Sequence, residues 1–179
     1  GHFWVNDNEY WAEPGGQIVE KKNTWHYSGQ LGKWLWFNSE GVVVRNQVLK
    51  IGDAEYYFDW DGIMQTGVFT CYADDEKDKV LYANTSGAID RSQGWKLVNG
   101  SWYYVKANGE AAHDEIITVG GKRYYMGSEG IMQSGNFYVW DGEKSYEYYT
   151  DNSGVIITNN WVLDQLEWYF TDNEGNILK

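Results

Sequence analysis

The chain is poor in the residues that build disulfides, metal sites and membrane spans. Its only cysteine is Cys71, so no disulfide can form within the chain and no cysteine-rich metal site can be built. The three histidines, His2, His26 and His113, are scattered without the spacing of metal ligands. No stretch is apolar over the length of a bilayer crossing, and no signal-peptide pattern opens the sequence. The fold must therefore rest on other interactions.

Basic residues are also scarce. The sequence has 14 lysines and arginines against 26 aspartates and glutamates, a formal net charge of −12 at pH 7. Binding along nucleic acid, or to an anionic membrane, needs clustered basic side chains, so neither is an expected partner. The acidic balance keeps a tyrosine-rich surface soluble, and it would also attract a cationic ligand.

Aromatic residues and glycines are abundant, and they mark an internal repeat. The 179 residues include 11 tryptophans, 15 tyrosines and 21 glycines. An aromatic residue stands five positions before each of eight glycines that recur at intervals of 21 to 25 residues: Gly16, Gly41, Gly62, Gly87, Gly109, Gly130, Gly154 and Gly175. The pattern predicts a single repeat domain, residues 1–179, with units at approximately 1–22, 23–46, 47–66, 67–93, 94–114, 115–134, 135–159 and 160–179.

Each unit is typical of a β-hairpin. Aromatic runs such as "WYYV" favour a strand, and they are followed by a polar turn ending in glycine, as in "KANG" and "NSEG", and then by a short apolar run such as "GIMQ". A lone hairpin is marginally stable in water, but stacked hairpins bury their aromatic residues against one another. No segment has helical periodicity. The sequence therefore predicts an all-β solenoid of about eight stacked hairpins.

A longer period lies above the short one. The position seven residues before the repeat glycine holds tryptophan in every third unit: Trp34, Trp102 and Trp168. In the other five units the same position holds Glu9, Glu55, Val80, Arg123 and Glu147. Glu and Arg are almost never buried unpaired, so we expect this position, and its tryptophans, to be exposed. Gly1 also matches a unit start, so we expect the chain to be cut at repeat boundaries from a longer protein.

The stretch "GWKLVNGSWYYVKANGEA", residues 94–111, closely resembles the cell-wall-binding repeat. This repeat is shared by pneumococcal and phage choline-binding proteins, streptococcal glucan-binding domains and clostridial toxins, and "YYFDWDGIMQTGVF", residues 56–69, is most similar to the clostridial branch. The resemblance extends over the chain as eight degenerate copies. It implies a left-handed superhelix with about three hairpins per turn, and hence tryptophan-bearing units aligned on one side.

The same resemblance implies a function. Such modules are not catalytic, and they attach a covalently linked catalytic or toxin domain to a polysaccharide, a cell-surface glycan or choline-bearing teichoic acid. The implied location is extracellular, secreted or attached to the surface of a Gram-positive bacterium. Neither a cofactor nor insertion into a membrane is expected.

The aromatic residue five positions before the glycine recurs in every unit, and we interpret it mainly as core. The candidate sites instead pair each exposed tryptophan with the tryptophan near the start of its unit, and the resemblance adds a third aromatic residue from the following hairpin. The predicted sites are Trp25, Trp34 and Tyr57; Trp95, Trp102 and Tyr125; and the pair Trp161 and Trp168, which has no following hairpin in this sequence. Trp25 and Trp34 are nine residues apart rather than seven, so the sequence does not establish the geometry of this site.

Two chemistries suit these aromatic sites. An aromatic cage binds quaternary ammonium by cation–π attraction, whereas a sugar ring stacks on tryptophan and needs polar groups nearby. Glu55 beside the first site would favour a cation, and Arg123 beside the second would oppose one. Choline-binding members of the family keep a fuller set of the tryptophan motifs than the three found here, so the resemblance favours a glycan. Choline binding is the alternative, and a structural spacer or protein-interaction stalk, in which the tryptophans only stabilise the fold, is the alternative from another class.

Other motifs give weaker signals. "HDE" at 113–115 is expected to be a solvated loop, and "DDEKD" at 74–78 is an acidic insertion without the spacing of a calcium loop. No arrangement of Ser-His-Asp, Cys-His or a glycine-rich phosphate loop is present. The sequence therefore predicts a binding module and not an enzyme.

Overall fold

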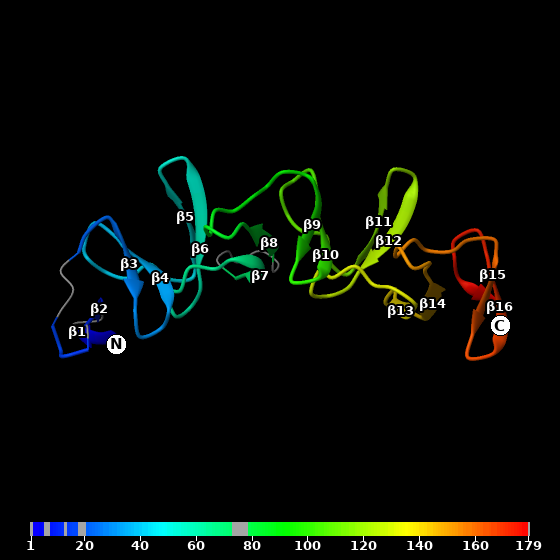
Figure 1. Cartoon of the computed structure of the whole chain (residues 1–179), viewed down its shortest axis with the longest axis horizontal. Coiled ribbons are helices and arrows are strands. Elements are labelled where there is room, and N and C mark those ends of the chain that lie inside the picture. The colour runs from blue at the N-terminus through cyan, green and yellow to red at the C-terminus, as the bar shows by residue number, and fades with distance from the viewer. Residues whose placement is uncertain (1, 6–7, 13, 18–20, 73–78, 179) are drawn as a thin grey trace. The chain divides into compact units, whose positions relative to one another are not determined.

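The computed structural model describes every residue except 1, 6–7, 13, 18–20, 73–78 and 179. The described residues form strands and turns and no helix, so the predicted all-β class is confirmed. Figure 1 shows the strands paired as successive hairpins in chain order, from blue at the N-terminus to red at the C-terminus. The acidic stretch 74–78, considered above for calcium, lies outside the described residues.

The chain divides into two compact units. The first comprises Gly1–Ser92 with Ala107–Glu110, and its strands are β1 (His2–Val5), β2 (Asn8–Trp11), β3 (Thr24–Ser28), β4 (Lys33–Phe37), β5 (Gln47–Ile51), β6 (Ala54–Phe58), β7 (Gly67–Cys71) and β8 (Lys79–Ala83). The second comprises Gln93–Lys106 with Ala111–Lys179. Its strands are β9 (Gly94–Val98), β10 (Ser101–Val105), β11 (Glu115–Val119), β12 (Lys122–Met126), β13 (Asn136–Trp140), β14 (Ser145–Tyr149), β15 (Trp161–Asp164), β16 (Glu167–Thr171) and β17 (Ile177–Leu178). The hand of the expected superhelix stays a prediction.

The turn at each repeat glycine explains why the motif recurs. In five repeats an Asn or Asp three residues before the glycine accepts hydrogen bonds at Oδ1 from the backbone N–H groups two and four residues later. The five are Asn38, Asp59, Asn84, Asp151 and Asp172. The glycine then adopts a left-handed conformation, with φ of 82° at Gly41 and 76° at Gly62, which costs other residues free energy.

Consecutive hairpins are joined by a repeated backbone hydrogen bond. The N–H of the residue two positions after the glycine donates to the carbonyl of the residue seven positions before the glycine in the preceding hairpin. Met64 bonds Trp34 at 2.9 Å, and Ile89 bonds Glu55 at 2.8 Å. In the second unit Met132 bonds Trp102 at 2.9 Å. The conserved spacing therefore sets how one hairpin lies on the next.

Close packing reinforces this stacking. A Cβ atom added to Gly62 would lie 2.5 Å from a methyl group of Val43 in the preceding repeat. At Gly154 it would lie 2.6 Å from the Cε of Met132. At Gly62 glycine is therefore required both for its φ angle and for the approach of the preceding hairpin, whereas at Gly154 the flexible end of the Met132 side chain can move aside.

The aromatic position five residues before the glycine contributes to the core, as predicted. Trp11, Tyr57, Tyr125 and Tyr149 are buried at this position, and its other four members are partly buried. The position seven residues before the glycine is less uniform than predicted. Its three tryptophans are exposed, but Val80 is buried, because β8 carries an aliphatic residue where the remaining four hairpins carry a charged one.

Candidate ligand-binding pockets

Trp25 is the centre of an aromatic cluster in the first unit. Its ring lies 6.3 Å from that of Trp34 at an interplanar angle of 87°, and 5.2 Å from Trp36 at 76°. From the next hairpin, the ring of Tyr56 lies 4.9 Å away at 74°. These edge-to-face arrangements are the favoured geometry for aromatic pairs. Trp25 is half-buried by the cluster, whereas Trp34 stays 44% exposed.

A pocket of about 350 Å³ opens beside this cluster. It is lined by residues of three successive hairpins, namely Trp25, Trp34, Tyr56, Met64 and Ser86. The backbone bond from Met64 to Trp34 fixes the methionine against the tryptophan. Ser86 comes from the repeat turn of the third hairpin, where its hydroxyl donates to Asn84 Oδ1 at 2.6 Å. Among the residues that the structure describes, no charged side chain lines the pocket.

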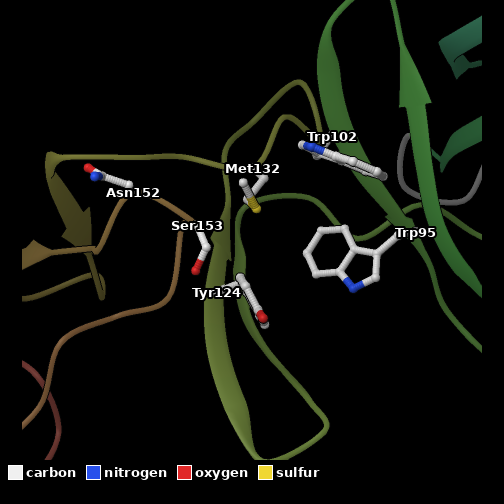
Figure 2. Close-up of a pocket in the computed structure, with 6 residues that line it drawn as sticks. All are labelled: Trp95, Trp102, Tyr124, Met132, Asn152 and Ser153. Carbon is white, nitrogen blue, oxygen red and sulfur yellow. The ribbon is translucent and has the colours of Figure 1, made fainter.

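The second unit contains a pocket of the same construction, of about 370 Å³. Its lining residues are Trp95, Trp102, Tyr124, Met132, Asn152 and Ser153. Figure 2 shows the two tryptophans facing Met132 and Tyr124, with Ser153 and Asn152 beyond them. Trp95 lies 6.3 Å from Trp102 at 86°, and 4.9 Å from Tyr124 at 73°. The two aromatic clusters are therefore nearly identical.

This agreement shows that the longer spacing of Trp25 and Trp34 leaves the geometry of the pair unchanged. In β3–β4 Trp25 pairs with Trp36, and in β9–β10 Trp95 pairs with Tyr104. In both hairpins the second tryptophan lies two residues before that partner, so it is diagonal to the first. The two extra residues are taken up in the loop, which runs over 29–32 in the first hairpin and over 99–100 in the second.

The third aromatic residue predicted for each pocket needs correction. Tyr56 and Tyr124 line the pockets, and Tyr57 and Tyr125 do not. Tyr57 is buried, stacks on Phe69 at 5.2 Å, and donates its hydroxyl to Asn46 at 3.0 Å. Successive strand residues point to opposite faces, so only one member of each tyrosine pair can face the tryptophans.

Tyr125 has the same environment as Tyr57 in the second unit. It stacks on Phe137 at 4.9 Å and donates its hydroxyl to Asp114 at 3.1 Å. Burial raises the pKa of both tyrosines, most strongly by removing the phenolate from water. These are the properties of core residues. Because both residues of each pair are tyrosines, the sequence alone did not show which one faces the site.

The charges expected to distinguish the two sites also lie outside the pockets. Glu55 is paired with Arg91, at 2.8 Å between Oε2 and Nε. Arg123 donates to the carbonyl of Glu174 at 2.5 Å. Neither side chain lines a pocket, so neither favours or opposes a cation there by direct contact.

The third predicted pair, Trp161 and Trp168, has the same diagonal register. Trp161 pairs with Phe170, two residues after Trp168, and its ring lies 5.3 Å from Phe170 at 67°. Both tryptophans are more exposed than their counterparts, at 59% and 64%. Within the described residues, no tyrosine from a further hairpin packs on Trp161 as Tyr56 packs on Trp25.

The remaining motifs have structural explanations. In "HDE", Asp114 accepts the bond from Tyr125 and Glu115 pairs with Lys106 at 2.7 Å. A search of the described residues finds no group of three His, Cys, Asp or Glu side chains able to hold a metal ion. Among the same residues, no helix is long and apolar enough to span a membrane. Cys71 is a buried thiol.

Comparisons with known proteins agree with this architecture. The profile of the cell wall binding repeat matches residues 93–111 and 117–132. Glucosyltransferase-S of Streptococcus mutans is 30% identical over 162 residues, which cover 89% of this chain and 11% of that protein. An endo-beta-N-acetylglucosaminidase of Streptococcus pneumoniae is 30% identical over 117 residues, 64% of this chain and 16% of that protein. The chain thus spans a small part of the curated relatives that it matches.

A solved structure shares the fold. Choline binding protein F of Streptococcus pneumoniae aligns with a TM-score of 0.59 at 22% identity, over 100% of this chain and 57% of that one. The profile covers the two hairpins that carry Trp95, Trp102, Tyr124 and Met132 of the second pocket, and Glucosyltransferase-S extends the similarity over most of the chain. The chain therefore contains cell wall binding repeats, at residues 93–111 and 117–132.

Proposed function

We propose that this chain is a non-catalytic module that binds a carbohydrate polymer of a cell surface through its two aromatic pockets. One observation carries the proposal: the same cluster of two tryptophans and a tyrosine is built twice, with ring separations that agree to 0.1 Å. Trp34 and Trp102 remain partly exposed in both copies. Exposed tryptophans held in a repeated geometry indicate ligand binding rather than packing.

A glycan is the first candidate ligand. The exposed face of Trp34 or Trp102 can stack on the C–H face of a sugar ring, and the hydroxyls of Tyr56 and Ser86 can bond its hydroxyls. The sequence similarity to a glucosyltransferase over 89% of the chain supports this candidate, because a glucosyltransferase handles glucosyl units.

Choline is the second candidate, and the ring geometry favours it. Three rings meet at steep angles, between 73° and 87°, and a methionine closes the pocket, so an enclosed cation would touch several aromatic faces. Such cages bind quaternary ammonium groups with about 2 kcal/mol or more per desolvated contact. Similarity to choline binding protein F supports this fold but not the ligand.

The proposed setting is extracellular. We place the module in a longer protein, secreted by or attached to a Gram-positive bacterium, with a catalytic or toxin domain elsewhere in the chain. The support is that the matched relatives are streptococcal enzymes of which this chain spans 11% and 16%. The module then concentrates the attached activity at its polymer.

The test is a titration of the chain with choline, isomalto-oligosaccharides and peptidoglycan fragments, followed by tryptophan fluorescence. We expect saturable quenching by at least one of them, weakened by Trp34→Ala and by Trp102→Ala. Quenching by choline alone would identify choline, and not a glycan, as the ligand. No response to any of the three would contradict both candidates and favour the structural stalk.

A further inference from the structure

Two large aromatic side chains project from β13 outside both pockets. Tyr138 is 60% exposed and Trp140 is 66% exposed, and alternate residues of a strand share a face. The opposite face of β13 carries Phe137, which is buried between Tyr125 and Tyr148. The fold therefore uses one face of β13 for packing and leaves two neighbouring aromatic rings in water.

A carboxylate is held beside these rings. Glu147 of β14 lies directly opposite Tyr138 in the strand register. Its Oε1 accepts hydrogen bonds from the Tyr138 hydroxyl at 2.9 Å and from the Asn136 amide at 2.8 Å. An ionised acceptor strengthens both bonds, so the carboxylate and the tyrosine ring keep a defined arrangement.

We propose that Asn136, Tyr138, Trp140 and Glu147, here named the β13 platform, form a separate binding site for a neutral saccharide. Exposed aromatic rings offer an apolar surface to the C–H face of a sugar, the Asn136 amide can bond its hydroxyls, and the Glu147 carboxylate holds the Tyr138 hydroxyl and the Asn136 amide in place. This site goes beyond the proposed function of the pockets, because it shares no lining residue with either of them.

The equivalent hairpin of the first unit shows that the fold does not require these residues. At the position of Tyr138, β7 carries Thr70, and at the position of Glu147, β8 carries the buried Val80. Thr70 and Val80 are paired just as Tyr138 and Glu147 are. Tyr72, at the position of Trp140, is half exposed, and Val80 stands where β14 carries Glu147. Tyr72→Ala is therefore a matched control.

The experiment uses the full chain with Trp34→Ala and Trp102→Ala, so that neither pocket contributes. Isomaltotriose and triacetylchitotriose are added separately, and the indole N–H signals and the backbone N–H signals of β13 are followed by ¹H–¹⁵N NMR, with the Trp140 indole assigned from Trp140→Phe and the backbone signals used for the Trp140→Ala variant. We expect one trisaccharide to shift the Trp140 signal saturably. Trp140→Ala should weaken binding about tenfold or more and Glu147→Gln about threefold, while Tyr72→Ala leaves it unchanged.

The platform would be overturned if neither trisaccharide shifts the Trp140 signal, or if the Trp140→Ala variant binds with the same affinity as its parent. It would also be overturned by a concentration-dependent dimer that Trp140→Ala abolishes, because such a dimer would make this face a contact between copies of the chain. Failure of the proposed pockets would appear in a different experiment, as the absence of fluorescence quenching in the chain with Trp34 and Trp102 intact.

Discussion

At the scale of single residues, strand alternation decides which aromatic side chains are core and which face a ligand. Tyr56 and Tyr57 are adjacent, yet one lines a pocket and the other is 1% exposed and stacked in the core. The same division separates Tyr124 from Tyr125. The chemical type of a residue is therefore a poor guide to its part in the site, and its position in the pleat is a good one.

Substitution of the two adjacent tyrosines tests this division. Tyr57→Ala should lower the free energy of unfolding by about 3 to 5 kcal/mol, because it leaves a cavity in the core. Tyr56→Ala should cost far less stability and should weaken ligand quenching. Urea unfolding and fluorescence titration measure the two effects. Equal losses of stability in both variants would contradict the assignment of faces.

The repeat turn beside the second pocket predicts a pH dependence of stability. The Ser153 hydroxyl and the backbone N–H groups of Val155 and Ser153 hold the pKa of Asp151 below its ordinary value of 3.8. A lowered pKa in the folded state means that this carboxylate stabilises the fold fully above about pH 4, and that the contribution is lost as pH falls through the folded pKa.

Asp151→Asn should therefore reduce the loss of stability between pH 5 and pH 2, because the amide does not titrate there. Asn38 and Asn84 form the same turn in the first unit, so the substitution is expected to preserve its geometry. Urea midpoints measured across this pH range check the prediction. An unchanged pH profile in the variant would count against it.

At the scale of the hairpin, the repeat glycine connects local conformation to stacking. Gly62 has a φ of 76°, and a Cβ there would lie 2.5 Å from Val43 and 3.1 Å from the carbonyl oxygen of Val44. Gly52, in the loop of the same repeat's hairpin, has a φ of 63° but no atom within 4 Å of an added Cβ. The two positions separate the cost of backbone conformation from that of packing.

Gly52→Ala should lower the free energy of unfolding by about 1 to 2 kcal/mol, the cost of a left-handed conformation for a residue with a Cβ. Gly62→Ala should cost clearly more, because the methyl group also forces the preceding hairpin away. Denaturant unfolding compares the two variants. If their losses are the same, the glycine is required for its φ angle alone.

The hairpins could be predicted from the sequence because their signals are local. Asn99 and Gly100 form the tight turn that their sequence indicates, with φ of 51° and 84°, and the aromatic runs on either side become β9 and β10. Trp34 and Trp102 were also predictable as exposed residues, because the same position of the repeat holds glutamate or arginine in other hairpins. Met64, Met132, Ser86, Ser153 and Asn152 were missed as lining residues, because the next two hairpins bring them to the pocket. Their repeated distance from the glycine was the available signal.

At the scale of the whole molecule, the central claim is that one repeat pattern builds the same binding pocket in each of two units. Two weak sites on one chain bind a polymer more tightly than either site alone, because binding at the first raises the effective concentration of polymer at the second. Loss of one pocket should then weaken retention on a polymer more than it weakens binding of a small ligand to the pocket that remains.

The most direct test measures the affinity of the Trp34→Ala/Trp102→Ala variant for the ligand that quenches the unaltered chain. Trp60→Ala is the matched control, because Trp60 is 64% exposed and lines neither pocket. We predict that the double variant stays folded and binds at least about tenfold more weakly, while Trp60→Ala binds as the unaltered chain does. A folded double variant with unaltered affinity would contradict the assignment of the pockets as ligand-binding sites.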